Sequence, residues 1–258
     1  MVTDVICNAP NGTMSTVRTE EGTIGRPKAP LPYLAEGKSG MLSARKIVVI
    51  AALMLVQWPV LAQEINLNAR LLIAARQDDT RLVNSLLMEG AKANSRNRAG
   101  DSPLNLAARK GNAEMATALL EHGSDIDLAN IAEVTPLMAA AYEGHLALVE
   151  MFLAKGAKLD RHDRLGKTAI VYAAANGHTA VVERLLSAGI DVNARYANDL
   201  TILMWAAGTG MRETVALCLA RGADLNAQDN RGKTARMMAR EQGHPEVEAL
   251  LAAAGAKE

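Results

Sequence analysis

The sequence predicts an all-α repeat solenoid, in which six similar helical units form a curved stack. Three observations support this fold class. Residue types recur with a period of 33 positions, hydrophobic residues make up 49% of the 258 residues although only 3% are aromatic, and alanine and leucine are abundant. A conventional large core relies on aromatic side chains for its buried area, whereas alanine and leucine favour helices that pack closely.

The period runs in strict register, without an insertion. A hydroxyl side chain recurs at one point of five successive units: Ser102, Thr135, Thr168, Thr201 and Thr234. A glycine recurs nine positions further on, at Gly111, Gly144, Gly177, Gly210 and Gly243. Such periodicity is typical of stacked repeats. We place the units at residues 66–98, 99–131, 132–164, 165–197, 198–230 and 231–256.

Each unit contains the signals of a helix, a turn and a second helix. The Ser or Thr is a helix N-cap, because its oxygen accepts from otherwise unpaired amides, and Pro103 and Pro136 follow it where a missing N–H costs nothing. The glycine then ends the first helix. A second helix, such as 178–188, carries an apolar face at helical spacing. An extended stretch, such as 190–194, leads to the next unit.

Polar substitutions distinguish the first and last units. Asp78 and Asp79 stand where later units have glycine and histidine, and Glu248 stands where three other units have valine. A terminal unit has no neighbour on one side, so polar residues there protect the stack. We therefore expect six units to form the whole repeat domain, within residues 63–258.

The pattern resembles the ankyrin repeat over roughly residues 66–256. The likeness rests on Thr135-Pro136-Leu137 at a helix start, on the pairs Gly144-His145 and Gly177-His178, and on the run Gly222-Ala223-Asp224-Leu225-Asn226-Ala227. The resemblance implies that each unit ends in a projecting β-hairpin, that the stack is curved and that the partners are proteins.

Two features depart from the ankyrin pattern. The histidine that usually follows the helix-start leucine is replaced in five units, by Asn105, Met138, Val171, Met204 and Met237. We therefore expect apolar packing at these positions. Glu133 and Asp199 stand at hairpin positions that hold glycine in three other units, so these two tips are expected to bend differently.

The segment before the repeats has a different composition. Residues 1–40 contain four prolines and five glycines, which interrupt any helix or strand period. Residues 41–62 have a short basic start, an apolar run at 47–56 and small residues up to Ala62, which is the order of a secretory signal peptide. We predict cleavage after Ala62 and export to the periplasm of a bacterium.

Alternatives remain open for this segment. In the simplest interpretation translation starts at Met41, and residues 1–40 are an extension that is not native or is disordered. Alternatively, residues 1–40 extend the basic region of a signal peptide that still permits export. The run 47–56 is shorter than the roughly 20 residues of a membrane-spanning helix. If it is nevertheless retained, the protein is a membrane-anchored cytoplasmic adaptor.

Composition argues against several functional classes. Lys+Arg and Asp+Glu number 28 each, so the formal net charge is zero and nothing indicates a nucleic-acid partner. Two cysteines are too few for a disulfide framework or a cysteine-rich metal site. We find no zinc-binding histidine pair and no phosphate, dinucleotide or nucleophile motif. We therefore predict a monomer that is not an enzyme and that needs no cofactor or metal.

Several single residues of types that often act in catalysis or ligand binding have structural interpretations here. Cys218 is expected to be a small buried hydrophobe, and Trp205 is expected to pack between repeats. Three histidines that follow a glycine at a helix start are expected to be structural: His145, His178 and His244. Glu143 with His162 is a weak candidate for the alternative of an enzyme or small-molecule binder in the concave groove.

The leading hypothesis is a non-catalytic scaffold that binds a protein through the concave surface of hairpin tips and first helices. Positions there that the fold does not dictate carry apolar groups rimmed by charge, a pattern typical of interaction sites. The candidate contact residues are Arg98, Arg109, Ile131, Val134, Tyr142, Glu143, His162, Arg164, Leu165, Lys167, Asn176, Tyr196, Asn198, Leu200 and Arg231.

Overall fold

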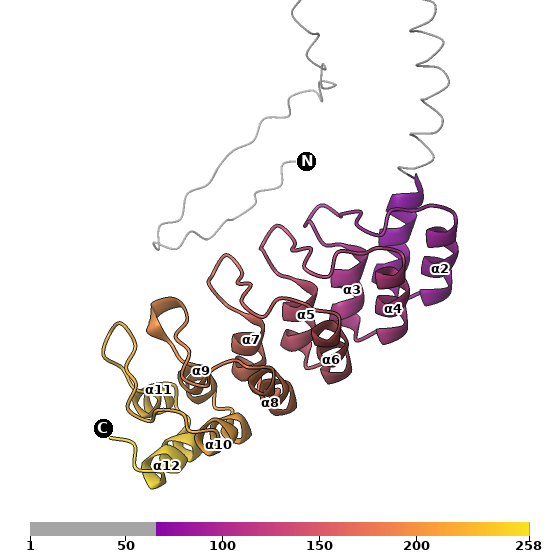
Figure 1. Ribbon diagram of the computed structural model, residues 1–258. Coiled ribbons are helices and arrows are strands. Elements are labelled where there is room, and N and C mark those ends of the chain that lie inside the picture. The colour runs from indigo at the N-terminus through magenta and orange to yellow at the C-terminus, as the bar shows by residue number, and fades with distance from the viewer. Residues whose placement is uncertain (1–65, 258) are drawn as a thin grey trace, which may run out of the picture. The chain divides into compact units, whose positions relative to one another are not determined.

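The computed structural model describes residues 66–257, and all regular structure in that segment is helical (Figure 1). A first helix occupies residues 66–77. The elements that follow are α2 (Thr80–Met88), α3 (Pro103–Lys110), α4 (Ala113–Glu121), α5 (Pro136–Glu143), α6 (Leu146–Ala154), α7 (Ala169–Ala175), α8 (Thr179–Ser187), the short 3-10 helix η1 (Ala197–Asp199), α9 (Ile202–Gly208), α10 (Arg212–Ala220), α11 (Ala235–Glu241) and α12 (Pro245–Ala253). Within residues 66–257 the expected hairpins are loops without strands.

The helices form two layers, and successive helix pairs follow one another in chain order (Figure 1). In the first layer α3 packs against α5, α5 against α7, α7 against α9 and α9 against α11; the second layer continues from α2 through α4, α6, α8 and α10 to α12. Five alanines are fully buried at equivalent places in the first layer: Ala107, Ala140, Ala173, Ala206 and Ala239. Their small side chains let neighbouring helices approach closely at interior packing density.

Most of the expected helix caps are present. The hydroxyls of Ser102, Thr135, Thr201 and Thr234 each accept a hydrogen bond from the backbone N–H three residues later, which satisfies an otherwise unpaired amide. Thr168 is the exception, because its side chain makes no capping bond to α7. Gly111 ends α3 with a φ of 75°, as the glycine period predicts.

The histidines at the starts of second-layer helices join neighbouring units. The distance from Nε2 of His145 to the carbonyl oxygen of Arg109 is 3.2 Å, and that from Nε2 of His178 to the carbonyl oxygen of Tyr142 is 2.8 Å. A Cβ atom at Gly144 would lie 2.4 Å from Nδ1 of His178, so this glycine also makes room for the ring. The structural role predicted for these two histidines is confirmed.

A side-chain oxygen closes four of the loop tips. The side chains of Asn97, Asn130, Asp163 and Asp229 each accept hydrogen bonds from the backbone N–H groups two and four residues later. Tyr196 stands at the fifth equivalent position and cannot make these bonds. Its tip instead forms η1, where both Asn198 and Asp199 have left-handed backbones. The different bend predicted for the Asp199 tip is therefore confirmed.

The expectation for the Glu133 tip was wrong, because this loop keeps the bend of its glycine-containing neighbours. Glu133 has a φ of 65°, against 78° for Gly100 at the equivalent position. The backbone N–H of Glu133 donates to the carbonyl of Asn130 at 2.9 Å, and the Asn130 side chain closes the same turn. Local hydrogen bonds therefore hold a residue with a side chain in a conformation that favours glycine.

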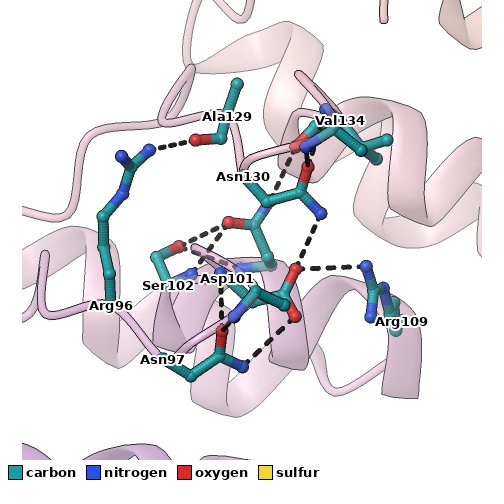
Figure 2. A network of polar contacts seen from close by, with 11 residues as sticks. Arg96, Asn97, Asp101, Ser102, Arg109, Ala129, Asn130 and Val134 are labelled. Atoms are coloured by element: carbon teal, nitrogen blue, oxygen red, sulfur yellow. Dashed lines mark hydrogen bonds and ion pairs between the residues drawn. The ribbon is translucent and has the colours of Figure 1, made fainter. Parts of the chain in front are cut away.

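Polar contacts join consecutive loops, as Figure 2 shows for the second and third units. Nδ2 of Asn130 donates to Oδ1 of Asp101 at 2.8 Å, and Nδ2 of Asn105 donates to the carbonyl of Val134 at 3.3 Å. Asn105 is buried and acts through hydrogen bonds, so the apolar packing expected there was wrong. Burial of the apolar side chains at the equivalent positions is confirmed for Met138, Val171 and Met204.

The predicted signal segment at 41–62, its alternative as an anchor, and the extension at 1–40 lie outside the described residues. Within residues 66–257, no helix combines the length and the apolar character that crossing a membrane requires.

The Glu133 tip yields a stability prediction. Replacing Glu133 by glycine should relieve the left-handed backbone strain and raise the free energy of unfolding by about 1 kcal/mol. Glu133→Ala is the matched control, because it also removes the carboxylate, whose Oε1 lies 4.0 Å from Nε of Arg164, but keeps Cβ. Urea unfolding measures the stability of both variants, and the slope of the free energy of unfolding against urea concentration should stay unchanged. Equal stability of the glycine and alanine variants would show that the tip carries no strain.

Candidate binding surface

We define the loop–helix face as the surface formed by the loop tips together with the first-layer helices α3, α5, α7, α9 and α11. Eleven of the predicted contact residues are exposed: Arg98, Arg109, Ile131, Tyr142, Glu143, His162, Arg164, Leu165, Asn176, Asn198 and Arg231. The other four are half-buried: Val134, Lys167, Tyr196 and Leu200. All fifteen keep some surface that a partner can reach.

The first hollow on this face, the Tyr142 hollow, has a volume of about 330 Å³. Its lining includes four of the predicted residues: Arg109, Val134, Tyr142 and Glu143. The ring centroids of Tyr142 and Tyr172 lie 5.6 Å apart in an edge-to-face arrangement, which is favourable for aromatic pairs. Tyr142 is 49% exposed, so its ring is available to a partner while Tyr172 supports it.

Tyr172 is held firmly in place. Its hydroxyl donates to Oδ2 of Asp163 at 2.5 Å. Burial raises the pKa of the Tyr172 phenol, and the hydrogen bond to the negatively charged Asp163 raises it further. The phenol is therefore neutral at physiological pH and fixes the ring beside Tyr142.

The second hollow, the Trp205 hollow, has a volume of about 250 Å³. Leu200 and Arg231 contribute to its lining, together with Met204, Trp205 and Met238. Trp205 packs partly against the core, as the sequence predicted. The same indole also lines this hollow, which the sequence interpretation missed.

Lys167 connects the two hollows. Its Nζ lies 5.6 Å from the ring centroid of Tyr172, which lines the Tyr142 hollow, and 5.0 Å from that of Trp205. Both distances are within the range of cation–π attraction. Tyr172 and Trp205 occupy equivalent positions in successive units. Because the chain has so few aromatic residues, their recurrence at one repeat position is a sequence signal that could have predicted this contact.

A third hollow, the His162 hollow, lies between two loops and has a volume of about 580 Å³. Tyr196 lines it and is half-buried there, and burial raises the pKa of its phenol to about 12. His162 lines this hollow whereas Glu143 lines the Tyr142 hollow. The geometry thus gives no support to a catalytic pair made from Glu143 and His162.

The remaining predicted residues lie on the loop tips and at a helix end. Arg98, Ile131, Arg164, Leu165 and Asn198 belong to successive tips, which are linked through backbone bonds such as Ile131 N–H to the Ala99 carbonyl at 3.0 Å. Asn176 follows α7 directly. Leu165 is 70% exposed and Ile131 is 52% exposed, so two of the tips present apolar side chains to solvent.

The thiol of Cys218 and the grouping of possible metal ligands also bear on the chemistry that the sequence raises. Cys218 is fully buried, as predicted, and burial raises the pKa of its thiol to about 12, so it is not a thiolate nucleophile at neutral pH. Within the described part of the chain, no three histidine, cysteine or acidic side chains are grouped so that they could hold a metal ion.

Comparison with known proteins gives one match. A family model described as "Ankyrin repeats (3 copies)" matches residues 71–163, 123–196 and 170–257. These overlapping matches extend over most of the segment that the structure describes. A search among curated proteins found no match.

The geometry of Tyr172 predicts a late titration. The folded state binds the phenolic proton of Tyr172 more tightly than the unfolded chain does. The contribution of this group to the free energy of unfolding is therefore complete below about pH 10, the usual tyrosine pKa, and is lost as the pH rises above it. The difference in tyrosinate absorbance between the wild type and Tyr172→Phe should therefore appear only above that pH. A difference that appears at the ordinary tyrosine pKa would contradict the buried bond to Asp163.

Proposed function

The chain belongs to the ankyrin-repeat family, and from that premise we propose that it is a non-catalytic scaffold that binds another protein through its loop–helix face, in the periplasm after export. Repeats of this family imply protein–protein interaction. The choice of surface, the compartment and the absence of catalysis are the specific parts of the proposal.

The exposed apolar groups on the loop–helix face carry this proposal. The exposed large hydrophobic residues in the described part of the chain are Ile73, Met88, Ile131, Tyr142 and Leu165. Three of these five, Ile131, Tyr142 and Leu165, belong to loops or to a first-layer helix of the second to fourth units. Exposed apolar groups that are gathered and rimmed by charge mark interaction sites, and tyrosine is a frequent hot spot of binding energy.

The face is also preformed, which favours binding. Side chains of the chain itself close the loop tips at Asn130 and Asp163, and Asp163 holds the Tyr172 ring through its hydroxyl. A surface that is ordered before it meets a partner loses little conformational entropy on binding.

The periplasmic part of the proposal rests on residues 41–62, whose order of basic, apolar and small residues is that of a signal peptide. We predict that the protein isolated from cells that express the full sequence lacks residues 1–62 and begins at Gln63. Intact mass and N-terminal sequencing measure this. A mature chain that keeps the run 47–56 and fractionates with membranes would support the anchored adaptor instead.

The binding proposal is tested by affinity capture from a periplasmic extract of the encoding organism. A bait that carries Tyr142→Glu and Leu165→Glu should lose a protein that the wild-type bait retains, with affinity reduced roughly tenfold or more, since truncating a hot spot costs at least about 1–2 kcal/mol. Met88→Glu is the matched control, because Met88 is apolar and 80% exposed but lies in α2.

Circular dichroism must show equal helix content in all three baits. Retention of the same protein by the double variant would move the binding surface away from the loop–helix face.

A further inference from the structure

Two positions in each unit form a pair across the loop–helix face. One lies at the end of a loop and the other lies eight residues later, near the end of the first-layer helix. In the second unit the pair is Asp101 and Arg109, whose oxygen and nitrogen lie 3.1 Å apart (Figure 2). In the last unit the pair is Lys233 and Glu241, which also form an ion pair. The repeat therefore brings these two positions into contact and can match opposite charges there.

The pair is incomplete in the fourth unit. Lys167 occupies the loop position, but the helix position holds Ala175 where the last unit has Glu241. Within residues 66–257, ion pairs form at the equivalent positions of the second and last units but not at Lys167. Its ammonium group lies instead over the rings of Tyr172 and Trp205.

The nearby carboxylate of Asp163 is already engaged. Its Oδ1 accepts from the backbone N–H groups of Leu165 and Lys167, at 2.9 Å and 2.8 Å, and its Oδ2 accepts from the Tyr172 hydroxyl. A carboxylate that accepts several hydrogen bonds is held where those donors place it. Within residues 66–257, the half-buried Lys167 therefore forms no ion pair with Asp163 or with an acidic side chain of its own unit.

A hollow with apolar walls lies next to this cation, and the ion pair of Lys233 and Glu241 forms part of its rim. In the fifth unit the pair is Leu200 and Gly208, and both line the Trp205 hollow. Gly208 is the last residue of α9, and a Cβ atom built there would come no closer than 3.9 Å to its nearest neighbour, the Cβ of Met238. Glycine lowers helix stability relative to alanine, and neither backbone conformation nor space requires it here. Its effect is to keep the hollow open.

We propose that the partner binds here through an acidic segment with an adjacent apolar residue. An Asp or Glu side chain of that segment meets Nζ of Lys167, in the place that Glu241 has beside Lys233. A neighbouring aliphatic or aromatic side chain enters the Trp205 hollow. The proposal rests on the function proposed above and specifies the chemistry of its partner.

Charge matching favours a carboxylate over a polyanion such as nucleic acid. A polyanion is bound by several free cations that act together. In the lining of the Tyr142 and Trp205 hollows the cations are matched internally, since Arg109 pairs with Asp101, Arg231 with Asp229 and Lys233 with Glu241. One unmatched cation between two aromatic rings, beside an apolar hollow, fits one carboxylate and one apolar group.

The test is a selection of random twelve-residue peptides displayed on phage, carried out against the full chain. The wild type should enrich peptides with Asp or Glu next to an aliphatic or aromatic residue. Ala175→Glu should abolish this preference and weaken a selected acidic peptide about tenfold or more, because its new carboxylate takes the place of the peptide's. Ala175→Gln is the matched control and should keep both the preference and the affinity.

A second variant tests the hollow separately. Gly208→Leu fills the space beside Trp205 and should weaken the selected peptide several-fold while the preference for an acidic residue persists. None of these variants changes Lys167 itself. The helix content of every variant, measured by circular dichroism, must match that of the wild type.

The outcomes separate this inference from the proposed function. An acidic preference that survives Ala175→Glu, or selected peptides without acidic enrichment, overturns the inference but leaves the binding scaffold in place. Failure to select any peptide also counts against it, since a short acidic segment is then not what the face binds. The proposed function itself fails only if capture is insensitive to Tyr142→Glu and Leu165→Glu.

Discussion

Each unit of this stack can bury its apolar side chains only against the units before and after it. The first-layer helices meet through fully buried alanines such as Ala140 and Ala173, which leave no room for a larger side chain. An insertion in one helix would shift every later contact, so the 33-residue register is the constraint on which the rest of the structure depends. The same register leaves the outward positions of the loop–helix face free to vary, which is where binding properties can be placed.

The parts of the fold that the sequence predicts are those that local rules determine. The caps at Thr135 and Thr201, the glycine stops and the histidines at second-helix starts follow from residue type and register alone. Asn105 was misjudged because its hydrogen-bond acceptor, the carbonyl of Val134, lies 29 positions away in the next unit. Glu133 was misjudged because the hydrogen bonds of Asn130 outweigh the preference of a residue with a side chain for negative φ.

The proposed binding surface is harder to predict than the fold, because it depends on side-chain direction. The sequence predicts Lys167 as a contact residue but does not show that its ammonium group lies over Tyr172 and Trp205. That direction becomes intelligible once Ala175 is compared with Glu241, its equivalent in the last unit. Comparison of equivalent positions within one chain thus supplies information that residue types taken singly lack.

Four departures from the repeat pattern lie in the third to fifth units. The strained Glu133, the η1 tip at Asn198, the uncapped α7, and the missing side chain at Gly208 all lie there. Natural sequences tend to depart from local structural rules at functional sites, where stability is given up for another purpose. The exposed Tyr142 and the unmatched Lys167 fall in the same units although they are found by different criteria, exposure and charge. Because backbone, burial and charge deviate together in these units, selection for binding explains these departures better than chance loss of stability does.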